Sequence, residues 1–366
     1  MQSMNKTVFS MSIILLFLLS IYNPVLASNM DYIHNIQEND SNIQIEPKYY
    51  ALIGGCLIYE NDSFSIASTN ESLDSYHRYI YDSLLQSENW HEENIILLTD
   101  KNATRENVLF YLSYFAEIVS ENDIFLFSWH SHGSQVEDTD GDEAKYDPSD
   151  IFDEVILPYD VEVLNGKLQN YISDDELNIY LDAFSVEAMV INVEACFSGG
   201  LVDEDTVSTL DINKQGRIIL MSTSPNHLGW IHPVDAYGWM SSLGLMLQSP
   251  IADRNNDGWI SVEEAFKLAS PIYTFRTYFW YHLIPFMATS SLTYFALKII
   301  QSIIDSSLLP NNILIFLSLF CGLYNVWKIE HTSTDQGLAP AGNHATIKDG
   351  YPGDLPFIQL PVDDNS

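Results

Sequence analysis

The chain has 366 residues, enough for one large domain or two smaller ones. Its 50 acidic and 15 basic residues give a net charge of −35, which excludes nucleic-acid binding through phosphates and favours cationic partners, metal ions or adaptation to high salt. With 46% hydrophobic residues the chain can bury a substantial core, so wholesale disorder is excluded.

The N-terminus has the pattern of a secretory signal peptide over residues 1–27. Lys6 precedes an uncharged stretch, 7–27, that ends in Val-Leu-Ala, a plausible cleavage point. An uncleaved membrane anchor is the alternative, and either reading predicts that the following residues are exported. Residues 28–48 are polar and are expected to form a linker or pro-segment.

Residues 49–270 alternate between apolar runs and segments with helical spacing. Strands are expected at 49–56, 94–99, 123–130, 188–195 and 217–224, and helices at 72–87, 102–119 and 174–184. Thr104 is the expected N-cap of the second helix. This order predicts an α/β fold with a mostly parallel sheet flanked by helices, and places a functional site beyond the carboxyl ends of the strands.

Two motifs lie at such strand ends, FSWHSHG at 127–133 and EACFSGG at 194–200. Cys196 follows a buried strand and precedes small residues, which let backbone N–H groups approach a reacting carbonyl as an oxyanion hole. A thiol nucleophile needs a base, and a histidine from the neighbouring strand end can supply one. The three cysteines are too few for a disulfide framework, and a buried core cysteine is the alternative reading.

The order of these motifs resembles the caspase-like cysteine peptidases. SHGSQ at 131–135, the acidic stretch that follows, and YISDDEL at 171–177 are similar to metacaspases, whereas EACFSGG is more similar to the legumain branch. The resemblance covers roughly residues 50–250. It implies a caspase-like three-layer fold and a cysteine endopeptidase acting on proteins or peptides, with no organic cofactor.

The resemblance also implies roles for individual residues. His132 corresponds to the catalytic base and Cys196 to the nucleophile, and the N–H groups of Gly133 and Cys196 correspond to the oxyanion hole. Glu194 corresponds to an acid in the S1 pocket, where it favours cleavage after Arg or Lys. Cleavage after Asn, as in legumains, is the alternative, but residues 70–77 show no clear equivalent of the arginine that reads the asparagine.

Other positions are less well defined. Asp174 and Asp175 lie where relatives place acids near the substrate, although a helix-capping role is equally consistent with their position. His130 and Ser131 stand where metacaspases usually have Ser-Gly, and Phe197 stands where many have histidine. None of these departures removes a reacting group.

A metal site is the competing interpretation of the first motif. His130 and His132 are two residues apart and could share an ion, with Asp138, Asp140 or Asp142 completing the site. This interpretation leaves the cysteine motif unexplained.

Residues 253–264, DRNNDGWISVEE, match an EF-hand calcium loop. The predicted ligands of Ca²⁺ are Asp253, Asn255, Asp257, Trp259, Ser261 and Glu264, and Gly258 stands at the sharp turn. A structural or activating calcium ion is expected here, and a solvated Asp/Asn turn is the alternative. The acidic loop 138–153 has no such spacing; it is either a solvated loop or, as in relatives, a calcium-responsive one.

The C-terminal third contains two apolar windows within 278–327. Their length and polarity make them candidate transmembrane helices, and a buried helical hairpin is the alternative. Residues 328–366 are expected to be a loop-like tail. The whole sequence thus predicts an exported or membrane-attached peptidase; a legumain-type transamidase and a non-catalytic caspase-fold binding protein are the alternatives.

Overall fold

The computed structural model describes residues 46–66, 71–138, 152–202, 211–229, 238–278, 284–303, 311–334 and 345–361. The chain divides into two units, Met1–Glu46 and Pro47–Ser366, and every element below belongs to the second. The predicted signal peptide and nearly all of the predicted linker lie outside the described residues. So do Asp140 and Asp142.

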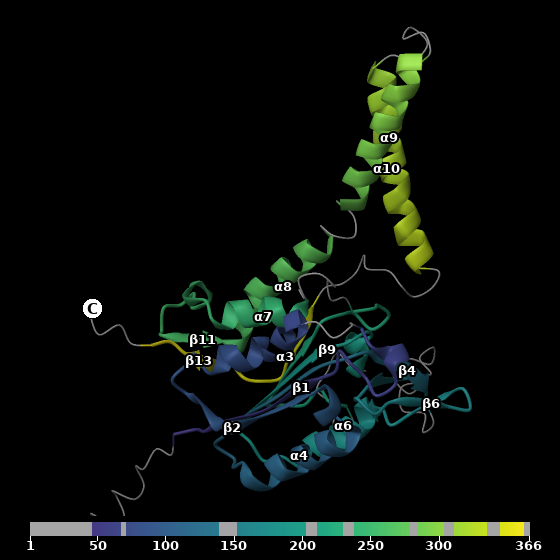
Figure 1. Cartoon of the computed structure of the whole chain (residues 1–366). Coiled ribbons are helices and arrows are strands. Elements are labelled where there is room, and N and C mark those ends of the chain that lie inside the picture. Colours follow the sequence, from purple (N-terminus) through teal and green to yellow (C-terminus); the bar gives the residue numbers. More distant parts are fainter. Residues whose placement is uncertain are drawn as a thin grey trace, which may run out of the picture. The chain divides into compact units, whose positions relative to one another are not determined.

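The central sheet has six strands in the order β12-β10-β9-β3-β1-β2 (Figure 1). Their bounds are β1 (Tyr49–Gly55), β2 (Trp90–Thr99), β3 (Ile124–His130), β9 (Ala188–Glu194), β10 (Arg217–Met221) and β12 (Thr346–Asp349). All neighbours are parallel except β10 and β12. Strands β1, β3, β9 and β10 are buried along their whole length, which explains their unbroken apolar sequences. The predicted mostly parallel sheet is confirmed.

Helices cover both faces of the sheet. They are α3 (Glu71–Leu84), α7 (Trp239–Leu247) and α8 (Val262–Tyr278) on one face, and α4 (Arg105–Ile118) and α6 (Asp174–Leu181) on the other (Figure 1). The predicted cap of α4 is confirmed, since Thr104 accepts the N–H of Asn107 at 3.3 Å. The α/β class and its three layers are therefore as expected, whereas α7 was not anticipated.

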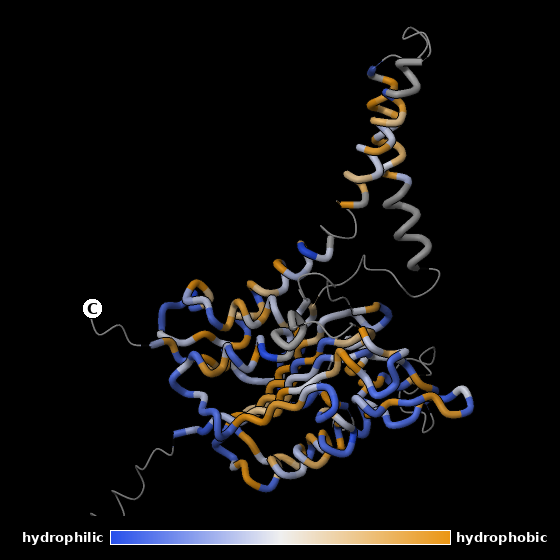
Figure 2. The backbone as a smooth tube through the Cα atoms, in the orientation of Figure 1, coloured by the Kyte–Doolittle hydropathy of each residue, from blue (hydrophilic) through white to orange (hydrophobic). Residues whose placement is uncertain are grey.

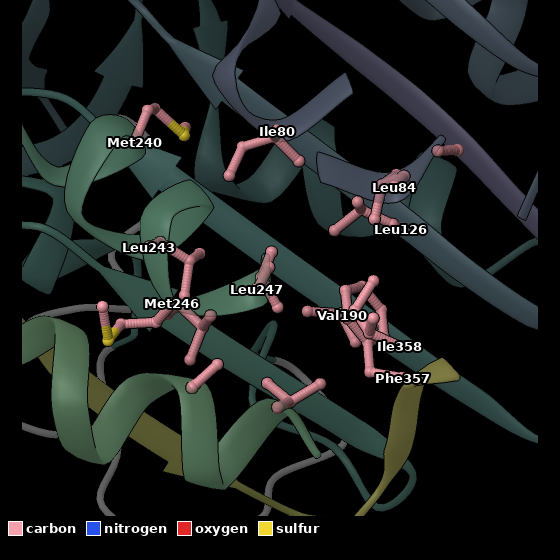
Figure 3. Close-up of a cluster of buried hydrophobic side chains, with 14 of the residues drawn as sticks. Ile80, Leu84, Leu126, Val190, Met240, Leu243, Met246, Leu247, Phe357 and Ile358 are labelled. Atoms are coloured by element: carbon pink, nitrogen blue, oxygen red, sulfur yellow. The ribbon is translucent and has the colours of Figure 1, made fainter. Parts of the chain in front are cut away.

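Apolar side chains from distant parts of the chain fill the space between the sheet and helices α3 and α7. Figure 3 shows Ile80 of α3, Leu243 and Leu247 of α7, Val190 of β9 and Phe357 in one cluster, and all of them are buried. Burying a side chain of this size contributes about 1.5–3 kcal/mol. The cluster fixes α7 against the sheet.

Smaller strands flank the carboxyl end of the sheet. They are β4 (Gly133–Glu137), β5 (Phe152–Ile156) and β8 (Ile172–Ser173) in one antiparallel sheet, and β6 (Glu162–Leu164) and β7 (Lys167–Gln169) in a hairpin. Short 3₁₀ helices also connect the described elements: η1 (Asp62–Phe64), η2 (Asp100–Asn102), η3 (Ser198–Leu201) and η4 (Pro250–Ala252). β4 begins at Gly133, the last residue of the first histidine motif.

The expectation of a loop-like C-terminal tail was wrong for residues 345–361. β12 joins the central sheet, and β13 (Pro356–Gln359) pairs with β11 (Trp259–Ser261) inside the predicted calcium loop. Ile260 and Ile358 face each other in this pair, and both are buried. Such short strands have too few residues for a local period, so their pairing depends on partners far away in the sequence.

The two apolar windows form helices α9 (Ile284–Ile303) and α10 (Asn311–Thr334), which pack against each other. Gly322 of α10 lies so close to α9 that an added Cβ would meet Ser290 Oγ at 2.1 Å. In Figure 2 the coloured parts of both helices contain apolar and polar residues. Among the described residues, none of the helices has the length and hydropathy that a membrane span requires. The predicted transmembrane helices are therefore not supported. The two helices do form a hairpin, but it is not the buried one of the alternative, since Leu292, Phe295 and Phe316 are exposed.

Candidate active site

The two predicted motifs meet because β3 and β9 are neighbours in the sheet. His130 and Glu194, the last residues of these strands, are paired in register, and the N–H of Ser131 donates to the carbonyl of Glu194 at 3.1 Å. His132 and Cys196 each lie two residues beyond that pair. Both line a cavity of about 290 Å³ at this edge of the sheet.

The remaining lining of the cavity comes from Ile66, Ser131, Glu194, Ala195, Leu228 and Gly229. Leu228 and Gly229, in the loop after β10, were not predicted from the sequence. Only the fold brings this loop to the cavity, since no chemical motif marks it.

The thiol of Cys196 lies among backbone N–H groups. The N–H of Gly229 donates to Sγ at 3.3 Å. Burial raises the pKa of the Cys196 thiol, and the N–H groups of Gly229, Gly133 and Cys196 itself partly offset this rise. The resting thiol is therefore protonated at neutral pH and needs a base. The nearby N–H groups of Gly133 and Cys196 are the donors predicted for the oxyanion hole.

The turn after the strand aims the thiol into the cavity. Phe197 adopts a left-handed backbone conformation with φ of +62°, and η3 follows it. The carbonyl of Ala195 accepts the Thr223 hydroxyl at 3.3 Å, and Phe197 N–H donates to the carbonyl of His227 at 2.8 Å. Gly133 must be glycine because an added Cβ would lie 2.0 Å from the carbonyl oxygen of Cys196.

His132 is held on two sides by groups that sequence analysis missed. Its Nε2 lies 2.8 Å from the backbone carbonyl oxygen of Phe64, and its ring stacks on Tyr59 with centroids 5.5 Å apart. The Tyr59 hydroxyl accepts the N–H of His132 at 2.8 Å. Burial lowers the pKa of His132 below 6.5, partly offset by the bond to Phe64. The imidazole is therefore neutral at pH 7, which is the form a general base requires.

Glu194 lies in the wall of the cavity with only 2% of its surface exposed. Its Oε1 accepts the N–H of Trp239 at 2.8 Å, and its Oε2 accepts the N–H of Met240 at 2.8 Å and the Tyr76 hydroxyl. Burial raises the pKa of Glu194 to about 7, although all three hydrogen bonds act to lower it. The carboxylate thus caps the N-terminus of α7 while it faces the cavity.

His130 does not share the surroundings of His132. It is buried, and its ring packs edge-to-face on Tyr76 with centroids 5.2 Å apart. Gly55 makes room for it, since an added Cβ there would lie 2.5 Å from the ring. The motif histidine that the sequence left unexplained thus packs against the tyrosine that holds Glu194.

The metal site considered for the first motif finds no support in the geometry. Within the described residues, which include His130, His132 and Asp138, no group of three or more His, Cys, Asp or Glu side chains gathers around a common point. Each histidine instead packs on its own tyrosine.

Asp174 and Asp175 lie in the first turn of α6, away from the cavity lining. Asp174 is buried and its Oδ1 accepts the N–H of Asp175 at 3.0 Å. The cap of the helix is Ser173, whose hydroxyl oxygen accepts the N–H of Glu176 at 3.2 Å. Neither aspartate is the cap, and their predicted contact with substrate stays a prediction.

The loop 253–264 adopts a tight turn, with left-handed backbone at Asn256 and Gly258. Asp253 Oδ2 accepts the N–H of Gly258 at 3.1 Å, and Glu264 reaches back from α8 to accept the N–H groups of Arg254 and Ser261. The carboxylates do not form a cluster of three in the described part of the chain. The calcium ligands therefore stay a prediction.

Part of this chain is similar in sequence to known proteins. Residues 58–205 match the family model "Metacaspase, peptidase C14 domain". Metacaspase-1 of Candida albicans is 29% identical over 130 residues, which cover 33% of this chain and 28% of that protein. Metacaspase-1 of Pyricularia oryzae is 30% identical over 138 residues, which cover 34% and 31%. The matched segment thus spans less than a third of either relative.

Among solved structures, caspase-1 from Spodoptera frugiperda aligns with a TM-score of 0.47 and 11% sequence identity, over 87% of this chain and 93% of that chain.

Proposed function

From the confirmed resemblance of this chain to the caspase-like cysteine peptidases of the metacaspase type, we propose that it is a cysteine endopeptidase. One observation carries the proposal: the Cys196 thiol and the His132 imidazole line one cavity, beside the N–H groups of Gly133 and Cys196. A nucleophile, a base and oxyanion donors at one place are what acyl transfer needs.

The arrangement assigns the proton transfers. Because Nε2 must donate to the Phe64 carbonyl, the neutral His132 ring carries its lone pair on Nδ1. Nδ1 takes the thiol proton as Sγ attacks the substrate carbonyl carbon. The oxyanion forms beside the N–H groups of Gly133 and Cys196, and the imidazolium then protonates the leaving amine. Water hydrolyses the thioester, again with His132 as base, and this restores the thiol.

Cleavage after Arg or Lys is the proposed specificity. A carboxylate offers about four lone pairs, of which Glu194 uses three, and the remaining one is on Oε1. A cationic P1 side chain that donates to Oε1 would neutralise a buried charge without displacing α7. An asparagine amide could make the same bond but would leave the charge uncompensated.

We also propose a structural calcium ion in the loop 253–264. The oxygens of Asp253, Asn255, Asp257, Ser261 and Glu264 and the carbonyl of Trp259 are the donors a hard cation prefers. The loop lies between η4 and α8 and pairs with β13, so calcium there would hold the C-terminal segment to α8.

The test is hydrolysis of fluorogenic peptides that differ only at P1, with Arg, Lys, Asn and Asp, in calcium and in EGTA. The expected result is turnover of the Arg and Lys peptides and none by Cys196→Ala. Turnover of Asn peptides alone would replace the proposed specificity with the legumain type. Activity that survives Cys196→Ala would exclude Cys196 as the nucleophile, and no turnover of any peptide by the natural chain would leave the non-catalytic binding protein. Adding an amine acceptor separates hydrolysis from transamidation.

A further inference from the structure

Glu154 is a buried acid that the proposed chemistry does not use. It lies on β5 with 3% of its surface exposed, and it is not part of the cavity lining. Its Oε1 accepts the side-chain amide of Gln135 at 2.8 Å. The two residues stand opposite each other in the antiparallel register of β4 and β5. On this side, the carboxylate is therefore fixed to the strand that begins at Gly133.

On its other side, Glu154 packs against the turn that follows the nucleophile. An added Cβ on Gly200 would lie 2.3 Å from the carboxyl carbon of Glu154. The carboxylate thus occupies the space where any other residue would place its side chain. Gly200 belongs to η3 and donates its N–H to the carbonyl of Phe197 at 2.8 Å, so contact with Gly200 is contact with the Cys196 turn.

The opposite side of this turn is anchored separately. Gly199 lies against the backbone after β10, where an added Cβ would meet the Thr223 carbonyl oxygen at 2.5 Å. The Ser198 hydroxyl accepts the N–H of Thr223 at 3.1 Å. The turn η3 thus lies between the backbone that follows β10 and the carboxylate of Glu154.

We propose that Glu154 is a positioning residue that sets the separation between the Cys196 turn and strand β4, which begins at Gly133 directly after His132. It contacts both segments, through Gln135 and Gly200, without entering the cavity. The inference rests on the proposed function for its effect on catalysis, but its effect on the thiol can be measured without a substrate. The positioning role of Glu154 depends on its shape and its hydrogen bonds rather than on its negative charge.

The experiment compares Glu154→Ala, Glu154→Gln, Gln135→Ala and the Glu154→Ala/Gln135→Ala double variant in the full chain. All carry Cys321→Ser, because Cys321 is the other partly exposed thiol whereas Cys56 is buried. Glu263→Gln is the matched control, since Glu263 is similarly buried but lies on α8. Each variant is measured for thermal unfolding, for kcat and KM on a P1 Arg peptide, and for the rate of Cys196 alkylation by iodoacetamide across pH.

Glu154→Ala should lower kcat on the order of 100-fold with little change in KM, as misplacement of a reacting group does. It should also shift the pH profile of Cys196 alkylation. Glu154→Gln should restore most of the activity. The double variant should be no worse than Glu154→Ala alone, because both changes break the same connection. Glu263→Gln should match the parent in kcat and alkylation.

Three outcomes would overturn the inference: a folded Glu154→Ala with parental kcat and alkylation profile, a Glu154→Gln as impaired as Glu154→Ala, or additive losses in the double variant. If Glu154→Ala does not fold, Gln135→Ala and Glu154→Gln decide, since an unaltered Gln135→Ala contradicts the connection. If the parent hydrolyses no peptide, the proposed function fails, whereas the alkylation profiles still test the positioning.

Discussion

Two buried glutamates, in two regions of the molecule, differ in the hydrogen bonds that their carboxyl groups accept. Burial raises the pKa of both Glu194, at the cavity, and Glu263, beneath the C-terminal segment, to about 7. Glu194 accepts three hydrogen bonds from α3 and α7. Glu263 accepts the N–H of Leu355 at 3.0 Å on Oε2, while its Oε1 is buried without a partner.

The surroundings of Glu194 stabilise an ionised carboxylate, whereas those of Glu263 disfavour one. At the cavity, donors from two elements are ready for the ionised form, so a cationic ligand meets a preorganised carboxylate. Under the C-terminal segment an ionised Glu263 is stabilised only by the backbone N–H groups of Leu355 and of Glu263 itself, and Asp349 and Asp354 oppose its charge. We expect substitutions at the cavity to alter catalysis, and substitutions under the C-terminal segment to alter stability.

The largest expected effect follows replacement of the base. His132→Ala should lower kcat by roughly 10²–10⁴, the range that general base catalysis contributes, because the Cys196 thiol is protonated at neutral pH. Burst and steady-state kinetics on a P1 Arg peptide measure the loss. The matched control is His91→Ala, which removes an exposed histidine on β2, outside the cavity lining. A His132→Ala variant with parental kcat would exclude the proposed base.

The next effect is on specificity. Glu194→Gln should lower kcat/KM for P1 Arg and Lys peptides by roughly 100-fold, since the cation loses its buried partner. P1 Asn peptides should be affected far less. The ratio of the two kcat/KM values is the measurement, because a general disturbance of α7 would lower both equally. An unchanged ratio would contradict a role for Glu194 in reading P1.

A smaller effect appears in the pH dependence. For Arg peptides, kcat/KM should rise with pH through about 7, where Glu194 ionises in the free enzyme. For Asn peptides, the rise should lie below pH 6.5, where His132 loses its proton. Profiles for both substrates, repeated with Glu194→Gln, test this assignment. Coincident acid limbs in the natural chain would contradict it.

The smallest effect is on stability. The pKa of Glu263 is raised in the folded state, so its contribution is fully present below pH 4.5 and is lost as pH rises through about 7. Glu263→Gln should therefore unfold at a Tm about 2–4 °C higher than the natural chain at pH 8, and no higher at pH 5. Calorimetry at both pH values measures the difference. An equal shift at both would show that ionisation is not the cause.

The first region is predictable from the sequence because local patterns of residues encode its strands. Long apolar runs predicted β3 and β9, and parallel neighbours necessarily bring His132 and Cys196 to one edge. The groups that hold His132 and Glu194 in place were not predictable in this way. Phe64 acts through a backbone carbonyl, and Tyr59 and Tyr76 carry no motif.

The second region was out of reach for a different reason. β11, β12 and β13 have three or four residues each, too few for a recognisable period. Their pairing depends on burial of side chains such as Phe357 against α3 and β2, which no local pattern announces. A tail rich in Pro and Gly therefore gave the wrong expectation of a loop.

Covalent labelling tests the central claim most directly. A peptidyl chloromethyl ketone with arginine at P1 is incubated with the full chain, and the modified residue is located by mass spectrometry. The account predicts one label, on Cys196, formed much more slowly in His132→Ala and suppressed by an excess of P1 Arg peptide. Labelling of Cys56 or Cys321 instead, or labelling of Cys196 at the same rate in His132→Ala, would contradict it.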